Sequence, residues 1–244
     1  MDVQIDHVQD FPYTDEHDPL RISGGFRLDP IENLSRILRT KFLPRFITES
    51  NNMLQIDLTD QEIQQKRSVS TIGTYGPDLR DHVPVFWHPR NPAAYRMITS
   101  ANTRGINMVF TEFATNLLDV PNVRLTSRHF LSRGFGSLSK YNPTTIRLEH
   151  IAALQQYFPS GKLRRWDQTD GRPETSSHIV HERGLLLQAE ILVPGGIGLD
   201  LISAMWVKNQ RSADEVLAMF SEAASKGSRV PSRIVICPDL FFAT

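Results

Sequence analysis

The sequence has a single cysteine, Cys237, among its 244 residues. One thiol cannot form an internal disulfide and cannot build a multi-cysteine zinc or iron–sulfur site. An excess of charge of either sign is also absent, because 27 basic side chains balance 27 acidic ones. Proteins that coat nucleic acid usually carry a basic excess, so this balance disfavours that class while leaving room for a small basic patch.

Long apolar runs are missing as well. No stretch of the sequence reaches the roughly 18 consecutive apolar residues that a membrane-spanning helix needs, so we expect no membrane span. The first 19 residues mix Asp, His and Pro without periodicity, and they lack the apolar segment of a secretory signal peptide. We interpret residues 1–19 as a polar leader, and we expect action in a cytosol, of the producing cell or of another.

Common motifs for phosphate binding and nucleophilic catalysis are absent too. Neither GxxxxGK[ST] nor GxSxG occurs, and Gly195–Gly198 lacks the spacing of a dinucleotide-binding fingerprint. The segment His178-Ile179-Val180-His181-Glu182 differs in order from the zinc-protease motifs. We therefore expect no metal in this protein.

Hydrophobic periodicity predicts a mixture of short strands and helices. Strands are expected over 19–27, 68–72, 185–193 and 229–237, and helices over 31–38, 107–118, 145–157 and 212–224. Ser212 and Glu215 have the spacing of a capping box at the start of the last helix. Because no βαβ rhythm appears, the expected fold class is α+β, with residues 20–244 as one domain and a helical and loop-rich insertion near 77–145.

The stretch Leu185–Ile197 carries the most information. Strand alternation would place Gln188 and Glu190 on the same face of an otherwise apolar strand. Polar side chains on such a face are costly to bury unless they line a cavity. The pattern therefore fits either a carboxylate beside a carboxamide at a pocket wall or an edge strand with a wet face.

Three motifs in order make the sequence resemble the mono-ADP-ribosyltransferase toxins of the cholera, pertussis and pierisin type, called R-S-E enzymes. The third motif corresponds to Gln188-Ala189-Glu190 followed by Gly195-Gly196-Ile197. The first corresponds to Phe26-Arg27-Leu28-Asp29 followed by Phe42-Leu43-Pro44-Arg45. The second corresponds to Val69-Ser70-Thr71-Ile72, which departs from the family at its last position.

A second candidate for the Ser motif is Phe135-Gly136-Ser137-Leu138-Ser139, which lies closer to Glu190 than Ser70 does. Choosing Ser137 would leave Arg27 far upstream and would require another arginine, such as Arg90. We prefer Ser70, because Phe26–Arg45 fits the first motif better.

The resemblance implies a fold of two packed antiparallel sheets with flanking helices and an NAD+ cleft between them. It also implies an enzyme that breaks the nicotinamide N-glycosidic bond of NAD+ and transfers ADP-ribose. Glu190 would then stabilise the positive charge that develops on the ribose. Arg27 would bind the phosphates or ribose of NAD+. Ser70 and Thr71 would position Glu190 and the ribose, and NAD+ as substrate would be the only cofactor.

The residue two positions before the glutamate informs the choice of acceptor in this family. Glutamate there accompanies arginine acceptors, whereas glutamine accompanies asparagine, cysteine, hydroxyl or nucleobase acceptors. A carboxamide cannot act as a general base, so Gln188 predicts a non-arginine acceptor. The balanced charge favours a host protein over nucleic acid. The expected protein is a monomeric effector, released without a signal peptide and acting in the host cytosol.

Other interpretations fit parts of the sequence. A degenerate transferase fold would act as a binding module without turning over NAD+. An unrelated structural protein would leave Arg27, Ser70 and Glu190 apart in space. Nucleic-acid binding through the basic stretch 124–140 would show an affinity that falls steeply with salt.

Overall fold

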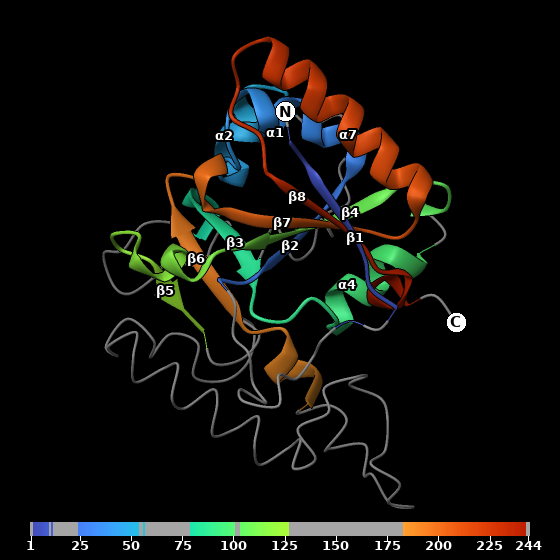
Figure 1. Ribbon diagram of the computed structural model, residues 1–244. Helices are drawn as coiled ribbons and strands as arrows, with labels where there is room; N and C mark the ends of the chain where they lie inside the picture. Colours follow the sequence, from blue (N-terminus) through green and yellow to red (C-terminus); the bar gives the residue numbers. More distant parts are fainter. Residues whose placement is uncertain are drawn as a thin grey trace, which may run out of the picture.

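The computed structural model describes residues 2–9, 11, 24–53, 56, 79–100, 103–126 and 183–242. These residues form one eight-stranded mixed sheet in the order β1-β8-β7-β4-β2-β3-β6-β5 (Figure 1). Ser70, Thr71 and Ser137 lie outside the described residues, as do the strand predicted over 68–72 and the helix predicted over 145–157. None of the helices in the described ranges is long and apolar enough to cross a membrane.

The strands are short. They are β1 (Gln4–His7), β2 (Phe26–Pro30), β3 (His82–Phe86), β4 (Met108–Phe113), β5 (Arg124–Leu125), β6 (Glu190–Pro194), β7 (Ile202–Val207) and β8 (Arg233–Ile236). The helices are α1 (Leu34–Arg39), α2 (Arg45–Ser50), α4 (Pro92–Thr99), α7 (Gln210–Ser225) and a short helix over 183–187. The 3-10 turns in the described residues are η1 (Ile31–Asn33), η2 (Leu79–Asp81), η4 (Thr115–Asp119), η6 (Leu199–Leu201) and η7 (Pro238–Phe241).

The sheet consists of two halves joined at a single residue pair. β2 pairs with β3 only at Phe26 and Phe86, whereas β2 pairs with β4, and β3 with β6, over five residues each. The two antiparallel sheets that we expected are therefore two parts of one sheet that divides at this pair. The far edge is parallel, because β8 runs parallel to both β1 and β7.

Alternation along the strands sends side chains to two cores, one on each face. The larger core packs the sheet against α1 and α7, and the smaller core packs it against α4 and η7 (Figure 1). The larger core includes Leu34, Val85, Val109, Ile191, Val207 and Phe220, and the smaller includes Phe26, Phe110, Trp206, Ala94 and Leu240. Each large apolar side chain buried here stabilises the fold by about 1.5–3 kcal/mol.

The segment predicted as a helix over 107–118 is instead strand β4 followed by the turn η4. All six residues of β4 are buried, because the strand lies between β2 and β7 and has a core on each face. A strand buried on both faces is apolar at consecutive positions, so its spacing also fits a helix. Residues 82–86 and 108–113, within the stretch expected to be an insertion, form the central strands β3 and β4.

The strand predicted over 185–193 begins only at Glu190, since residues 183–187 are helical. Short apolar runs fit either structure by periodicity alone. The helices predicted over 31–38 and 212–224 and the last strand are confirmed. The predicted capping box is wrong: Asn209 is the N-cap, and its side chain accepts a hydrogen bond from the Ser212 backbone at 3.0 Å.

Candidate active site

Glu190 lies at the junction of the two half-sheets. It is the first residue of β6 and pairs with Phe86, which in turn pairs with Phe26 on β2. Neighbouring strands lie about 4.8 Å apart, so the Cα atoms of Glu190 and Phe26 are roughly 10 Å apart across β3. The third predicted motif therefore meets the first motif where the sheet divides.

The Glu190 side chain is buried, with 2% of its surface exposed. Its neighbours Ile191 and Val193 belong to the larger core, so alternation directs Glu190 to the opposite face. The segment that leads into β6 is also held, because the Trp87 amide donates to the Ala189 carbonyl at 3.1 Å. The carboxylate thus projects from a backbone that is fixed from β3.

Gln188 lies in the turn between the helix 183–187 and β6. Its Nε2 donates to the Gly184 carbonyl at 3.1 Å, and only 7% of the residue is exposed. Its Oε1 is buried and has no hydrogen-bond partner among the residues that the structure describes. The amide oxygen is therefore an acceptor, held two residues from Glu190, that can take a hydrogen bond from a bound group.

Arg27 is held where β2 and β3 separate. Its Nε and Nη2 donate to the Asp29 carboxylate at 2.9–3.2 Å, and its Nη1 donates to the Pro84 carbonyl at 3.3 Å. The guanidinium also lies 5.9 Å from the centre of the Phe42 ring, within the range of a cation–π contact. Arg27 therefore links the two half-sheets, and 26% of its side chain remains exposed.

A second guanidinium, that of Arg36 on α1, belongs to the same charge cluster. Its Nε and Nη1 atoms are buried without hydrogen-bond partners in the described part of the chain. Burial lowers the pKa of Arg36; the negative charge of Asp29 opposes this shift, and the positive charge of Arg27 adds to it. Two cations thus share one carboxylate, an arrangement that can accept a further anion such as a phosphate.

The predicted site residues are only partly brought together. Phe26, Phe86 and Glu190 are paired across three strands, so their side chains point to the same face of the sheet. Arg27 is the next residue after Phe26, so its side chain points to the opposite face, that of the larger core. Gly195 and Gly196 of the third motif have φ of 69° and 109° and lead into Ile197, which pairs with Phe42. Strand β3, which lies between β2 and β6, was not predicted from the sequence.

Prolines explain why the sequence did not predict β3. Pro84 has no amide hydrogen and usually excludes a central strand. At this position, however, β3 has no ladder with β2, because the two strands pair only at Phe86. The carbonyl of Pro84 accepts from Arg27 instead. The apolar alternation of 82–86 was the signal that could have identified the strand.

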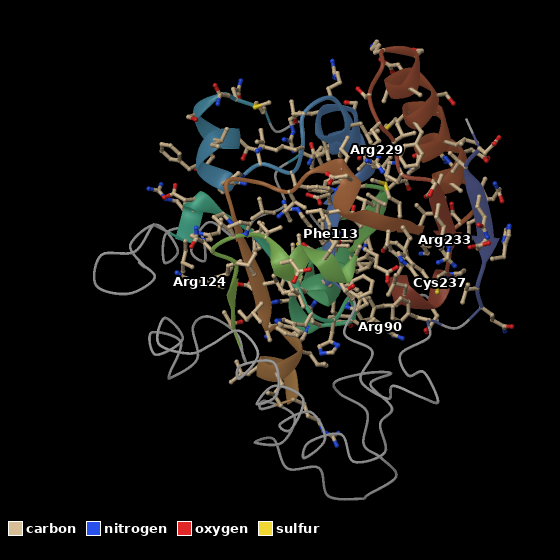
Figure 2. The ribbon with its side chains drawn as sticks, turned by 60° about the vertical axis from the view of Figure 1, so that its left-hand side comes forward. Arg90, Phe113, Arg124, Arg229, Arg233 and Cys237 are labelled. Atoms are coloured by element: carbon tan, nitrogen blue, oxygen red, sulfur yellow. The ribbon has the colours of Figure 1, made fainter. Side chains whose placement is uncertain are left out.

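Arg90, the alternative arginine, is anchored to the C-terminal turn. Its Nη1 lies 2.9 Å from the Asp239 carboxylate, and its guanidinium lies 4.7 Å from the centre of the Phe242 ring. Figure 2 shows Arg90 and Cys237 on the same side of the central Phe113, while Arg124 lies at the opposite edge of the molecule. Within the described ranges, no group of three or more His, Cys, Asp and Glu side chains could hold a metal ion.

A family model described as "ssDNA thymidine ADP-ribosyltransferase, DarT" matches residues 26–242. Thermus sp. 2.9 DarT in complex with ADP-ribosylated ssDNA is similar over 88% of this chain and 94% of its own, with 23% identity and a TM-score of 0.65. The same protein in complex with carba-NAD+ covers 88% and 96%, with 20% identity and a TM-score of 0.63.

Thermosipho africanus DarTG in complex with ADP-ribose is similar over 89% of this chain, with 16% identity and a TM-score of 0.63. This chain spans half the length of that DarTG chain. No curated protein matches the sequence. At these identities, the likeness to the solved structures establishes the shared fold.

These findings confirm the predicted ADP-ribosyltransferase fold, the enzyme class and NAD+ as the substrate. The matching family is DarT; the finer assignment to the cholera, pertussis and pierisin type has no such match. The predicted protein acceptor is wrong, because the family modifies thymidine in single-stranded DNA. Net charge was a poor guide to the acceptor, because it sums over the whole chain, whereas a nucleic-acid site needs only a local positive field.

Proposed function

This chain belongs to the DarT family of NAD+-dependent ADP-ribosyltransferases, and we propose that it transfers ADP-ribose from NAD+ to a thymidine base in single-stranded DNA. The observation that carries this proposal is the family match over residues 26–242, which includes the Gln188-Ala189-Glu190 motif. The placement of Glu190 at the junction of the two half-sheets supports the same assignment.

Glu190 is the proposed catalytic carboxylate. When the bond between nicotinamide and ribose breaks, nicotinamide leaves with the bonding electrons and the ribose carbon becomes positively charged. A carboxylate that is buried before the reaction stabilises such a charge more strongly than water does. The thymine nitrogen that attacks must also lose its proton. Glu190 can accept that proton, whereas the carboxamide of Gln188 cannot.

Gln188 is the proposed contact for the acceptor base. Thymine has one ring N–H flanked by two carbonyl oxygens. The Nε2 hydrogen of Gln188 that is not used by Gly184 would donate to one of these carbonyls. The ring N–H then stays directed at the ribose carbon and at Glu190, which takes its proton as the nitrogen attacks. A carboxamide complements this edge of the base. This complementarity accords with the non-arginine acceptor that glutamine at this position predicts.

Arg27 and Arg36 are the proposed contacts for the phosphates of NAD+, which would lie across the junction of the half-sheets from the ribose held at Glu190. The Asp29 carboxylate offsets only one of their two positive charges, and two Arg36 nitrogens have no hydrogen-bond partner among the described residues. A pyrophosphate would supply the missing negative charge. The roles of Ser70 and Thr71 beside Glu190 stay predictions.

The acceptor is tested with matched oligonucleotides and NAD+. One strand carries a single thymidine, the second carries cytidine at that position, and the third is the thymidine strand annealed to its complement. We expect the mass of one ADP-ribose to be added to the single-stranded thymidine oligonucleotide alone. An equal addition to the cytidine strand, or none to any strand while NAD+ is consumed, would contradict the proposal.

A further inference from the structure

Thr126 directly follows β5 and makes two hydrogen bonds with the backbone of Glu190. The Thr126 amide donates to the Glu190 carbonyl at 2.8 Å. In the other direction, the Glu190 amide donates to the Thr126 hydroxyl oxygen, Oγ1, at 2.7 Å. Thr126 is itself buried, with 1% of its surface exposed. The two residues therefore form a closed pair of hydrogen bonds away from water.

The Thr126 side chain accepts the hydrogen bond that a main-chain carbonyl would accept in a regular strand pair. β5 pairs with β6 at Arg124 with Leu192 and at Leu125 with Ile191, so the same register places Thr126 opposite Glu190. In a regular antiparallel pair, the Glu190 amide would donate to a main-chain carbonyl. Here the Thr126 hydroxyl is the acceptor, so one side-chain atom fixes the position at which β6 begins.

This position matters because the chain changes conformation there. Gln188 lies in a turn, and the strand begins two residues later at Glu190. On the other side of β6, the strand is held by the pairing of Glu190 with Phe86 and by the Trp87 amide on the Ala189 carbonyl. Thr126 supplies the matching restraint from β5. Without the hydroxyl, the Glu190 amide would lose its acceptor on this side, and only the bond from the Thr126 amide to the Glu190 carbonyl would remain.

We propose that Thr126 is a positioning residue, whose hydroxyl holds the Glu190 amide and thereby orients the Glu190 carboxylate for the reaction. This inference rests on the proposed role of Glu190 in ADP-ribose transfer. Thr126 acts through the backbone of Glu190, so its loss should affect turnover more than NAD+ binding. Small misplacements of a catalytic group can cost about a hundredfold in rate.

Three variants isolate the hydroxyl. Thr126→Val keeps the shape and removes the hydroxyl, and Thr126→Ser keeps the hydroxyl and removes the methyl group. The control is Thr111→Val on β4, where an equally buried threonine has an Oγ1 without a hydrogen-bond partner in the described residues. We expect kcat to fall at least about tenfold in Thr126→Val with KM for NAD+ nearly unchanged. Thr126→Ser and Thr111→Val should stay within about threefold of wild type.

Amide hydrogen exchange at Glu190 provides a readout that does not depend on activity. Exchange should be at least about tenfold faster in Thr126→Val and unchanged in Thr126→Ser, because only the first variant lacks the acceptor. A kcat within twofold of wild type in Thr126→Val, or an equal loss of kcat in the serine and valine variants, would overturn the inference. If wild type transferred no ADP-ribose to DNA, or Glu190→Ala kept full activity, the proposed function itself would fail; in that case, unchanged exchange in Thr126→Val would separately refute the hydrogen-bond restraint.

Discussion

Gln188 and Glu190 have different backbone settings although only Ala189 separates them. Gln188 lies in a turn, and its amide nitrogen is held by Gly184, whereas Glu190 begins a strand and is paired with Phe86. We propose that they take different parts in the reaction. Glu190 would serve the cleavage of NAD+ and take the proton of thymine, and Gln188, with the side-chain amide hydrogen that Gly184 leaves available, would hold the acceptor base.

Replacing Gln188 with alanine should therefore separate transfer from cleavage. We expect Gln188→Ala to reduce ADP-ribose transfer to a thymidine oligonucleotide at least about tenfold, equivalent to about 1.4 kcal/mol. Release of nicotinamide without DNA should change less than about threefold, because Glu190 is untouched. The matched control is Gln210→Ala, since Gln210 lies on α7 and its side chain donates to nearby Asp214. Parallel loss of both activities in Gln188→Ala would refute this division of roles.

Local motifs could be predicted from the sequence, whereas their partners could not. Gln188 and Glu190 form a short motif, and Arg27 with Asp29 is a pair two residues apart. Glu190 is held by Thr126, directly after β5, and Arg27 is held by Pro84 on β3, and both contacts depend on strand register. Register is set by the packing of the whole sheet, so it is not visible in any single segment.

At the scale of elements, the junction of the half-sheets depends on the glycines before β2. Gly25 has a φ of +97°, and a Cβ atom there would lie 2.8 Å from the Phe86 carbonyl oxygen and 2.6 Å from a Val85 methyl carbon. A side chain at this position would push β3 away from β2 at Phe26 and Phe86, the pair that joins the two strands. Phe86 also pairs with Glu190, so the displacement would reach the catalytic position.

Gly25→Ala should therefore destabilise the protein and reduce its activity. The control is Gly105→Ala, because Gly105 has a similar φ of +88° but no atom within 4 Å of the added carbon. Both variants carry the cost of a positive φ, about 1 kcal/mol. We expect Gly25→Ala to lose about 2 kcal/mol more, from overpacking. Urea denaturation measures the difference, and equal losses in the two variants would contradict the account.

The edge strand β1 should dock in a pH-dependent way. Asp6 accepts hydrogen bonds from Arg233 at 2.6 Å and from Gln4 at 2.7 Å, and these bonds, that from Arg233 foremost, hold the pKa of Asp6 below its ordinary value. A lowered folded-state pKa contributes stability that is present above the ordinary pKa and is lost as pH falls through the folded value.

Hydrogen exchange of the β1 amides tests this expectation. After correction for intrinsic rates, their protection should decrease as the pH falls from about 6 to about 3 in wild type. In Asp6→Asn, the protection should be lower at about pH 6 and should vary less with pH. Asp2→Asn serves as a control on the exposed residues before β1. A pH dependence that persists fully in Asp6→Asn would assign the effect to another group.

Helices with one buried face could be predicted from the sequence, whereas strand β4, which is buried on both faces, could not. The helices α1 and α7 show one apolar face, and both were recognised from periodicity. β4 has a core on each side, so its apolar residues Met108, Phe110 and Phe113 also fit a helical spacing. The prolines of 77–92 concealed β3, because a central strand normally needs every amide.

At the scale of the whole molecule, the net charge of zero must be compatible with the binding of a negatively charged DNA strand. With 27 basic and 27 acidic side chains, the chain offers little long-range attraction for DNA. Recognition should then depend on the base and on a few phosphate contacts. The predicted release without a signal peptide and the monomeric state stay predictions.

The salt dependence of DNA binding measures the number of phosphate contacts. For single strands, the slope of log Kobs against log salt is about −0.7 for each phosphate neutralised. We expect no more than about three such contacts, hence a slope shallower than about −2. Titration of a fluorescent oligonucleotide at several salt concentrations gives this slope. A value several times steeper would instead indicate an extended basic surface, such as the stretch 124–140.

We propose above all that Glu190 drives transfer of ADP-ribose from NAD+ to thymidine in DNA. Mass spectrometry of a single-thymidine oligonucleotide, incubated with NAD+ and either wild type or Glu190→Gln, tests it most directly. The account predicts one ADP-ribose added by wild type, and a rate at least about a hundredfold lower for a folded Glu190→Gln variant. Comparable transfer by the two proteins would contradict it.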